Sequence, residues 1–227
     1  MKKIFYIFLL GLIFISNAQS DTSHYKNISK IEMEIFRNDK LIGYSNYYFT
    51  HQDDTMTIKN YTQFKVKLLG VTFFSISSEA IEKYQDDKLV FFKSNTFQNN
   101  KEKFVNLKYD KNLNKFIIDG SSFKGEAKPN NVIGNWWNHK ILYANSQISP
   151  LSGSVKEQTV NLLKRETIKL YDKNYEVLHF KLKSKNENLS KEKKLIFDIW
   201  MDPRKGLIVK IAYERMGKWE YKLKNFE

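Results

Sequence analysis

Ile31-Glu32-Met33-Glu34-Ile35 alternates apolar and acidic side chains near the start of this chain. A period of two predicts a β-strand, because successive side chains of a strand point to opposite faces of the sheet. The same alternation returns in Phe64–Leu68, Leu178–Lys183 and Trp219–Lys224. The alternating runs are spread over the whole sequence, and we therefore expect an all-β, mainly antiparallel protein.

Short polar clusters separate the alternating runs. Asn38-Asp39-Lys40, Asp119-Gly120 and Asp172-Lys173-Asn174 supply residues that tolerate the backbone angles of tight turns. Their spacing predicts about ten strands joined as hairpins in a meander. A sheet of so many strands curves to protect its edges, so we expect a half-barrel or barrel, with a sandwich as the alternative. Lys and Glu are dense on the polar faces of the strands, which disfavours a transmembrane barrel.

An apolar run from Ile4 to Ile15 follows two lysines at the N-terminus. A bilayer span needs about 20 apolar residues, so this shorter run indicates a signal peptide rather than an anchor. We expect cleavage after Ala18, with Ser20 as the alternative, so that residues 1–18 are removed. The mature protein is then exported and, after cleavage, is not transmembrane.

The chain of 227 residues contains no cysteine. An exported protein without thiols has no disulfide framework, no thiolate metal site and no cysteine nucleophile. Burial of side chains alone must stabilise it, and roughly 200 residues suffice to bury about 70% of the surface of the unfolded chain. We expect residues 19–227 to form a single β-rich domain.

The formal net charge is +13 at pH 7. Lysine dominates this charge, since among 38 basic residues the arginines are Arg37, Arg165, Arg204 and Arg215. Nucleic-acid recognition favours the planar fork of arginine, so we expect no nucleic-acid partner. The lysines are dispersed, which is typical of a solvated basic surface, and an anionic membrane surface stays open as a partner.

The segment Pro129–Ala144 departs from the period of two. Its apolar residues fall at helical spacing, and Pro129 and Asn131 are typical of helix starts, so the pattern predicts one short helix near residues 132–143. This helix would close the open end of the curved sheet. Its tryptophans either fill the core or line a cavity for an apolar ligand. The candidate ligand-binding residues are Trp136, Trp137, His139, Ile141 and Trp200.

Four short motifs carry a resemblance to a known family. They are Asn38-Asp39-Lys40-Leu41-Ile42-Gly43, Asn135-Trp136-Trp137-Asn138, Pro150-Leu151-Ser152-Gly153 and Phe197-Asp198-Ile199-Trp200-Met201-Asp202. With them the chain resembles a family of exported bacterial proteins that is catalogued only as a domain of unknown function. The resemblance covers nearly all of the mature chain. It implies a β-rich envelope protein in the periplasm of a Gram-negative bacterium, and it implies no reaction.

The sequence contains no recognisable catalytic constellation. None of the four histidines stands at a metal-ligand spacing, no serine occupies a nucleophile elbow, and the nine glycines do not cluster. We therefore expect no catalytic residue, no metal, no cofactor and no enzymatic activity. The enzymatic alternative is a sugar-acting site in which Asp198, beside Trp200, or Glu79 faces a cleft.

Two non-enzymatic function classes remain. Aromatic residues make up 15% of the chain, which favours a binding or carrier module whose cavity holds an apolar, lipid-like ligand. The alternative is a structural or interaction protein of the envelope that binds an anionic surface or a partner protein. The first class predicts an enclosed volume near Trp136 and Trp137.

Overall fold

The computed structural model describes residues 23–227. The predicted signal peptide, residues 1–18, lies outside this part of the chain. Eight strands come first: β1 (Lys30–Arg37), β2 (Lys40–Gln52), β3 (Thr55–Leu68), β4 (Val71–Gln85), β5 (Lys88–Gln98), β6 (Lys101–Asp110), β7 (Lys115–Gly120) and β8 (Lys124–Ala127). Seven follow: β9 (Val132–Ile133), β10 (Ser146–Ile148), β11 (Val155–Leu170), β12 (Lys173–Ser184), β13 (Ile196–Asp202), β14 (Leu207–Glu214) and β15 (Lys218–Phe226). The two 3₁₀ helices of the described chain are η1 (Ser23–Tyr25) and η2 (His139–Leu142).

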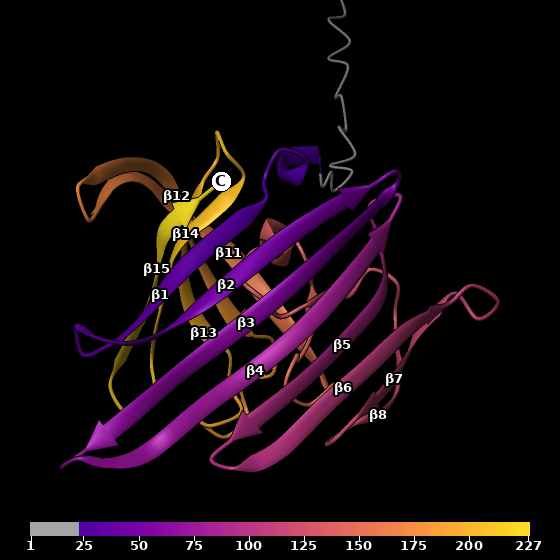
Figure 1. Cartoon of the computed structure of the whole chain (residues 1–227), viewed down its shortest axis with the longest axis horizontal. Helices are drawn as coiled ribbons and strands as arrows, with labels where there is room; N and C mark the ends of the chain where they lie inside the picture. The colour runs from indigo at the N-terminus through magenta and orange to yellow at the C-terminus, as the bar shows by residue number, and fades with distance from the viewer. Residues whose placement is uncertain (1–22) are drawn as a thin grey trace, which may run out of the picture.

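All fifteen strands form one sheet in the order β8-β7-β6-β5-β4-β3-β2-β1-β15-β14-β13-β12-β11-β10-β9. β1 pairs with both β2 and β15, so the first and last strands join the two halves of the sheet. Neighbouring strands are antiparallel except β9 and β10, which are parallel. β8 and β9 stand at opposite ends of the order, so the sheet is curved but not closed (Figure 1). This confirms the predicted all-β fold and identifies it as a half-barrel.

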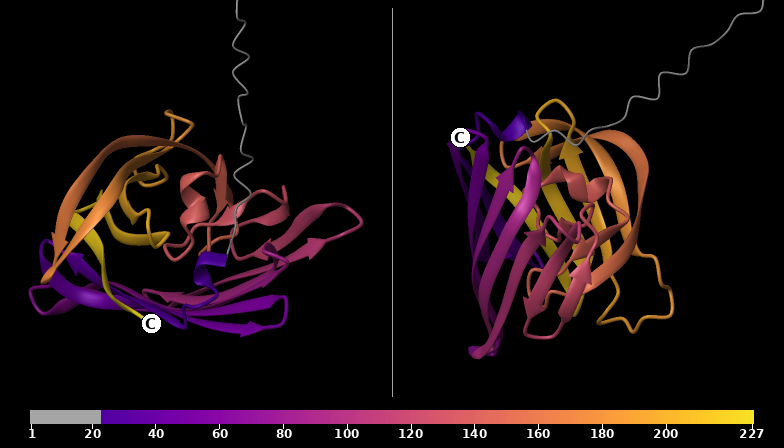
Figure 2. Two further views of the ribbon diagram at one scale, coloured as in Figure 1. Left: turned by 90° about the horizontal axis from the view of Figure 1, so that it is seen from above. Right: turned by 90° about the vertical axis from the view of Figure 1, so that its right-hand side faces the viewer.

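The segment between the two halves occupies the inside of the curved sheet. Figure 2, seen from above, shows the sheet as a trough with residues 128–154 between its two walls. We call residues 128–154 the inner segment. It leaves β8 at one edge of the sheet, crosses the concave side and continues into β11 in the other half. This path agrees with the prediction that residues near 132–143 close the open end of the curved sheet.

The short helix that the sequence predicts near residues 132–143 is present only as a single 3₁₀ turn. Residues 132–133 form β9, the following residues bend, and the helical part is His139–Leu142. Gly134 and Asn135 disfavour an α-helix, because glycine is flexible and asparagine side chains compete for backbone hydrogen bonds. Asn138 does so directly, since its Oδ1 accepts the N–H of Lys140 at 3.0 Å and caps the turn.

Tight turns occur at the polar clusters that separate the strands. Asn38, Asp39, Asp86 and Asn99 adopt left-handed backbone angles, with φ of 48°, 62°, 49° and 49°. Asparagine and aspartate tolerate this region better than other residues that carry a Cβ. The turn chemistry of the sequence therefore fixes where the hairpins reverse.

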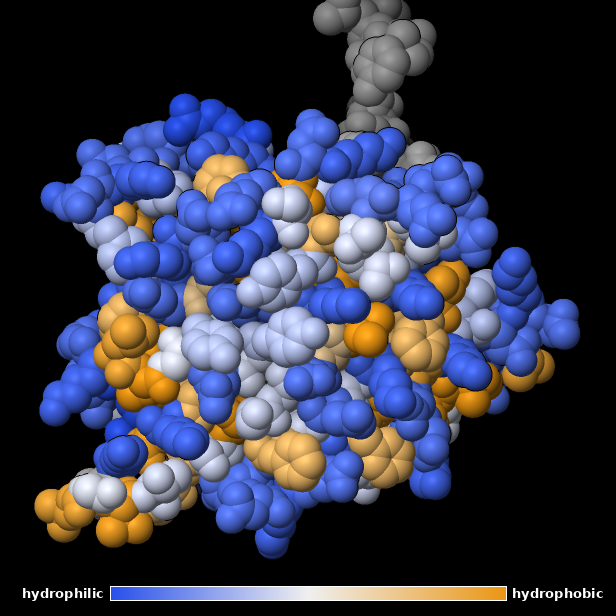
Figure 3. Space-filling view, in the orientation of Figure 1, coloured by the Kyte–Doolittle hydropathy of each residue, from blue (hydrophilic) through white to orange (hydrophobic). Residues whose placement is uncertain are grey.

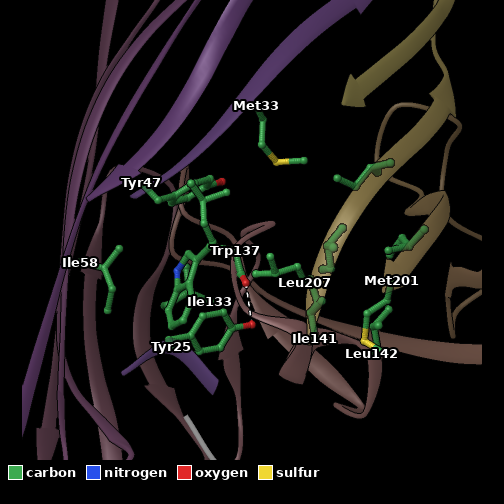
Figure 4. Packing of buried hydrophobic residues seen from close by; sticks show 14 of the residues in the cluster. Tyr25, Met33, Tyr47, Ile58, Ile133, Trp137, Ile141, Leu142, Met201 and Leu207 are labelled. Atoms are coloured by element: carbon green, nitrogen blue, oxygen red, sulfur yellow. Dashed lines mark hydrogen bonds between the residues drawn. The ribbon is translucent and has the colours of Figure 1, made fainter. Parts of the chain in front are cut away.

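The main core lies on the concave side, around the inner segment. Figure 4 shows Met33, Tyr47 and Ile58 from one wall pointing toward Trp137, and Leu207 approaching from the other. The side chain of Trp137 is 1% exposed. A second, smaller cluster fills the trough near the β3–β4 hairpin and consists of Ile35, Phe64, Val66, Ile76 and Trp219. Within residues 23–227, no helix is long and apolar enough to cross a membrane.

Candidate functional site

Side-chain amides hold the inner segment in place. Gln158 of β11 donates to the carbonyl oxygens of Ile141 and Ala144 at 2.9 and 3.0 Å. Its own oxygen accepts from Gln147 at 2.6 Å. Gly134 lies so close to Gln147 that a Cβ would stand 2.0 Å from Oε1, so any larger residue here would displace the Gln147 side chain. Because these amides are buried and paired, the inner segment has a defined path over the sheet.

A cavity of about 420 Å³ separates part of the inner segment from the sheet. Strands β2 to β5 form one wall, β14 and β15 form the other, and the inner segment covers it. Its volume lies within the range of about 300–1,000 Å³ that small-molecule sites occupy. The aromatic side chains of the lining are Tyr47, Phe64, Phe74, Phe92, Trp136, Tyr213, Trp219 and Tyr221.

The cavity has a buried end and an open end. Glu82 and Phe92, paired near the β4–β5 hairpin, are 2% and 1% exposed. Phe74 and Gln98, toward the ends of their strands, are half-buried, and Arg215 is exposed. We call this exposed end the mouth of the cavity. It lies at the end of the sheet that carries the β3–β4 hairpin.

Among the described residues that line this cavity, Glu82 is the only acidic one. Its Oε1 accepts hydrogen bonds from Trp137 Nε1 at 3.0 Å and Asn135 Nδ2 at 2.5 Å, and its Oε2 accepts one from Tyr84 at 3.0 Å. Burial raises the pKa of Glu82 to about 7, and the three hydrogen bonds only partly oppose this rise. At mildly acidic pH the buried end of the cavity is therefore uncharged.

A second hollow of about 250 Å³ adjoins the mouth. It shares Trp136, Tyr213 and Tyr221 with the first cavity and extends toward basic residues. Burial lowers the pKa of Lys156, and the nearby charge of Arg215 lowers it further. The basic residues of this lining are Lys156, Lys191, Lys194 and Arg215, and the acidic one is Glu214. The cavity thus passes from an apolar interior to a mouth in which positive charge predominates.

The inner segment contains three apolar candidate residues, Trp136, Trp137 and Ile141, and they lie in different places. Trp136 lines both hollows and packs edge-on against Phe197, with ring centroids 5.0 Å apart. Trp137 and Ile141 lie in the core, and Ile141 is fully buried. Trp136 and Trp137 lie where the chain bends between β9 and η2, and their side chains point in different directions. Trp137 contributes to the cavity only through its hydrogen bond to Glu82.

His139 lies away from this cavity, near the other end of the trough. Its Nδ1 is 2.8 Å from the hydroxyl of Tyr25, and its ring packs edge-on against His24. Burial lowers the pKa of His139 to about 4, with the charges of His24 and Lys140 adding to the effect. This histidine is therefore neutral at physiological pH and helps to hold the inner segment against η1.

Trp200 lies on the outer face of the sheet. Its Nε1 donates to Glu166 at 2.8 Å, and its ring stacks on His179 at 4.3 Å between centroids. Asp198 on the same face pairs with His179 and Lys181, at 3.0 and 2.7 Å. Glu79 is exposed. The lining of the cavity includes none of the residues proposed for a sugar-acting site.

Sequence reasoning missed Glu82, the residue with the most specific environment in the cavity. A signal was present in the sequence. Glu82 stands between Ala80 and Tyr84 in the period of two, so it occupies a core-facing position in β4. A carboxyl group at such a position is buried only with hydrogen-bond partners, which here come from the inner segment and Tyr84. Within the described residues no group of three or more His, Asp or Glu could hold a metal ion.

Fold and cavity together define a half-open β-barrel protein with an apolar cavity on its concave side. Residues 33–224 match the family described as a domain of unknown function, DUF6134, and the chain belongs to this family. This confirms the resemblance to a family catalogued only in that way. A comparison with curated proteins found no match.

Two solved structures match most of the chain. The chain is similar to a β-barrel-like protein of the domain of unknown function DUF1849 from Brucella abortus, with a TM-score of 0.58 and 11% identity over 88% of this chain and 96% of that one. It also matches a protein with a YmcC-like fold from Bacteroides fragilis, with a TM-score of 0.36 and 11% identity over 87% and 94% of the two chains. The first similarity supports the β-barrel-like architecture alone.

Proposed function

We propose that the protein is a non-catalytic binding or carrier module for an apolar, lipid-like ligand, and that the cavity under the inner segment holds this ligand. The observation that carries the proposal is the cavity of about 420 Å³ with its aromatic lining. The hollow opens to solvent at its mouth, so its aromatic lining stays in contact with water until a ligand covers it, and this favours an apolar ligand.

The polar groups of the cavity fit the same class of ligand. Glu82, with its pKa near 7, adds little charge at the buried end in mildly acidic solution. In the part of the chain that the structure describes, the buried Oδ1 of Asn135 has no hydrogen-bond partner. An orphaned acceptor beside the cavity is a local cost in stability, which is common where function constrains a site.

The place of action that we propose is the periplasm of a Gram-negative bacterium. The apolar run at residues 4–15 supports export, because its length and flanking lysines suit a signal peptide. A carrier in that compartment would shield an apolar molecule from water between membranes. The chain without thiols is also suited to folding there without disulfide formation.

Two neighbouring serines of β4 offer a matched test. Ser78 lines the cavity, whereas Ser77 is exposed on the opposite face of the same strand. Ser78→Phe places a ring inside the cavity, and Ser77→Phe adds the same ring outside. The probe is N-phenyl-1-naphthylamine, a neutral dye whose fluorescence rises in an apolar site, and palmitate serves as the competitor.

We expect the wild type and Ser77→Phe to bind the dye and to release it to palmitate, and Ser78→Phe to lose most of the signal. Urea denaturation of both variants checks that each folds. Equal dye binding by both folded variants, or no binding by the wild type, would refute the proposal.

A further inference from the structure

Three connections gather at the mouth of the cavity. The β1–β2 turn touches the β14–β15 turn, since the N–H of Asn38 donates to the carbonyl of Lys218 at 2.8 Å. β2 pairs with β3 through Gly43 and Phe64, so the β3–β4 hairpin projects from the same end. Phe64 and Trp219 of the cavity lining belong to these strands. We call this end of the half-barrel, with its three connections, the mouth end.

Large apolar side chains are exposed at the mouth end. Leu69 at the tip of the β3–β4 hairpin is 97% exposed, the highest value among the exposed large hydrophobic residues of the described chain. Figure 3 shows apolar side chains at the lower left, over the projecting ends of β3 and β4. The exposed members of this group are Leu41, Leu69, Val71, Phe73 and Met216.

Leu69 also stands at an unusual backbone position. Its φ is 49°, in the left-handed region, and Gly70 follows with φ of 82°. A Cβ makes this region unfavourable, and leucine has no polar side chain to compensate. Most other hairpins of the chain place Asn or Asp at the equivalent positions, as at Asn38, Asp53 and Asp86. A strained and solvated leucine contributes nothing to the folded monomer, which points to a contact outside the chain.

Positive charge surrounds these apolar residues. Lys65 and Lys67 lie on the β3 side of the hairpin tip and are exposed, and within residues 23–227 neither forms an ion pair with an acidic residue. The neighbouring turns add further basic residues. The three connections carry Arg37, Lys40, Lys65, Lys67, Arg215 and Lys218, against Asp39 and Glu214. Lys218 pairs with Asp39 and Glu220, and Glu192 lies beside Arg215, so part of this positive charge is balanced.

We propose that the mouth end docks on an anionic lipid bilayer, with the tip of the β3–β4 hairpin inserted among the head groups. Apolar side chains flanked by lysines bind such surfaces by combining burial with attraction to negative lipids. A protein partner would favour a broad apolar patch, whereas here Leu69, Val71 and Phe73 project on a narrow hairpin whose β3 arm carries Lys65 and Lys67. Docking holds the mouth of the cavity against the lipid, although the docking itself does not require the cavity to bind anything.

The test measures co-sedimentation of the full mature chain with vesicles. One set contains equal parts of phosphatidylglycerol and phosphatidylcholine, and the other contains phosphatidylcholine alone. The variant is Leu69→Asp, which removes the inserted side chain and suits the left-handed position, as Asp86 shows. The matched control is Leu113→Asp, in the turn between β6 and β7 at the opposite end of the sheet, where Leu113 is 54% exposed.

We expect the wild type and Leu113→Asp to bind the anionic vesicles, less so as salt is added, and Leu69→Asp to bind about tenfold more weakly. Failure of the wild type to bind anionic vesicles at low salt overturns the proposal. Equal binding of anionic vesicles by the two variants also overturns the proposal. It is overturned as well if the wild type does not bind vesicles but forms a dimer that Leu69→Asp abolishes. Dye binding by Leu69→Asp should be unchanged, which separates this result from a failure of the proposed cavity function.

Discussion

Replacing Glu82 by Gln should change how the stability of the protein depends on pH. Burial raises the pKa of Glu82 to about 7 in the folded state, from an ordinary value of 4.5. Between these two values the folded state keeps a proton that the unfolded chain releases. The stability that comes from this proton is fully present below pH 4.5 and is lost as the pH rises through about 7.

The magnitude follows from the two pKa values of Glu82. Each pKa unit corresponds to about 1.4 kcal/mol, so the full change is about 3 kcal/mol. Glutamine has nearly the same shape and does not ionise. The unfolding free energy of the wild type minus that of Glu82→Gln should therefore fall by about 3 kcal/mol between about pH 4 and about pH 8.

Urea denaturation of both proteins over this range measures that difference. The difference is needed because His139, with its pKa lowered to about 4, acts with the opposite sign. Its contribution to stability grows as the pH rises toward its ordinary value, but it is present in both proteins and cancels. A difference that stays flat, or rises with pH, would show that Glu82 is ionised in the folded protein and that water reaches the end of the cavity described here as buried.

Two further substitutions test the parts that hold the cavity in place. Tyr25→Phe should destabilise the protein by about 1–3 kcal/mol in urea denaturation, because the hydroxyl of Tyr25 donates to the carbonyls of Trp137 and Gly206 at 2.8 and 3.1 Å. An unchanged denaturation midpoint would mean that η1 does not anchor the inner segment. Burial opposes ionisation of Glu220, but hydrogen bonds from two lysines lower its pKa to about 2. Glu220→Gln should therefore destabilise the protein near neutral pH, and this loss of stability should shrink as the pH falls from 4.5 toward 2. Thermal denaturation at several pH values measures the loss. A loss that persists in acid would contradict the ion-pair account. The two lysines are Lys210 and Lys222, at 2.9 and 3.0 Å from the carboxylate.

The half-barrel could be predicted from local patterns in the sequence. Alternation such as that of Ile31 to Ile35 defines strands, and Asn38 and Asp39 define a turn, because both signals act between near neighbours. The predicted helix shows where such reasoning fails. Apolar residues at helical spacing around Trp136 form a bent path instead, and Gln158 of β11 binds the backbone carbonyls of Ile141 and Ala144 from outside the segment.

The candidate site was predicted only in part, for a related physical reason. Whether a residue lines a cavity depends on which segments meet, and periodicity does not contain that information. Trp136 reaches the cavity, while Trp137 packs in the core one residue later. Trp200 shares the aromatic character of both but faces outward, where Glu166 and His179 bind it. The buried carboxyl of Glu82 could have been singled out from its core-facing position in β4.

The central claim is that the space under the inner segment holds an apolar molecule. Native mass spectrometry of the protein purified from an envelope fraction tests this most directly, with Ser78→Phe and Ser77→Phe purified in parallel. We predict an added mass of one lipid-like molecule on the wild type and on Ser77→Phe, and its loss from Ser78→Phe. A bare protein mass in all three samples would contradict the account.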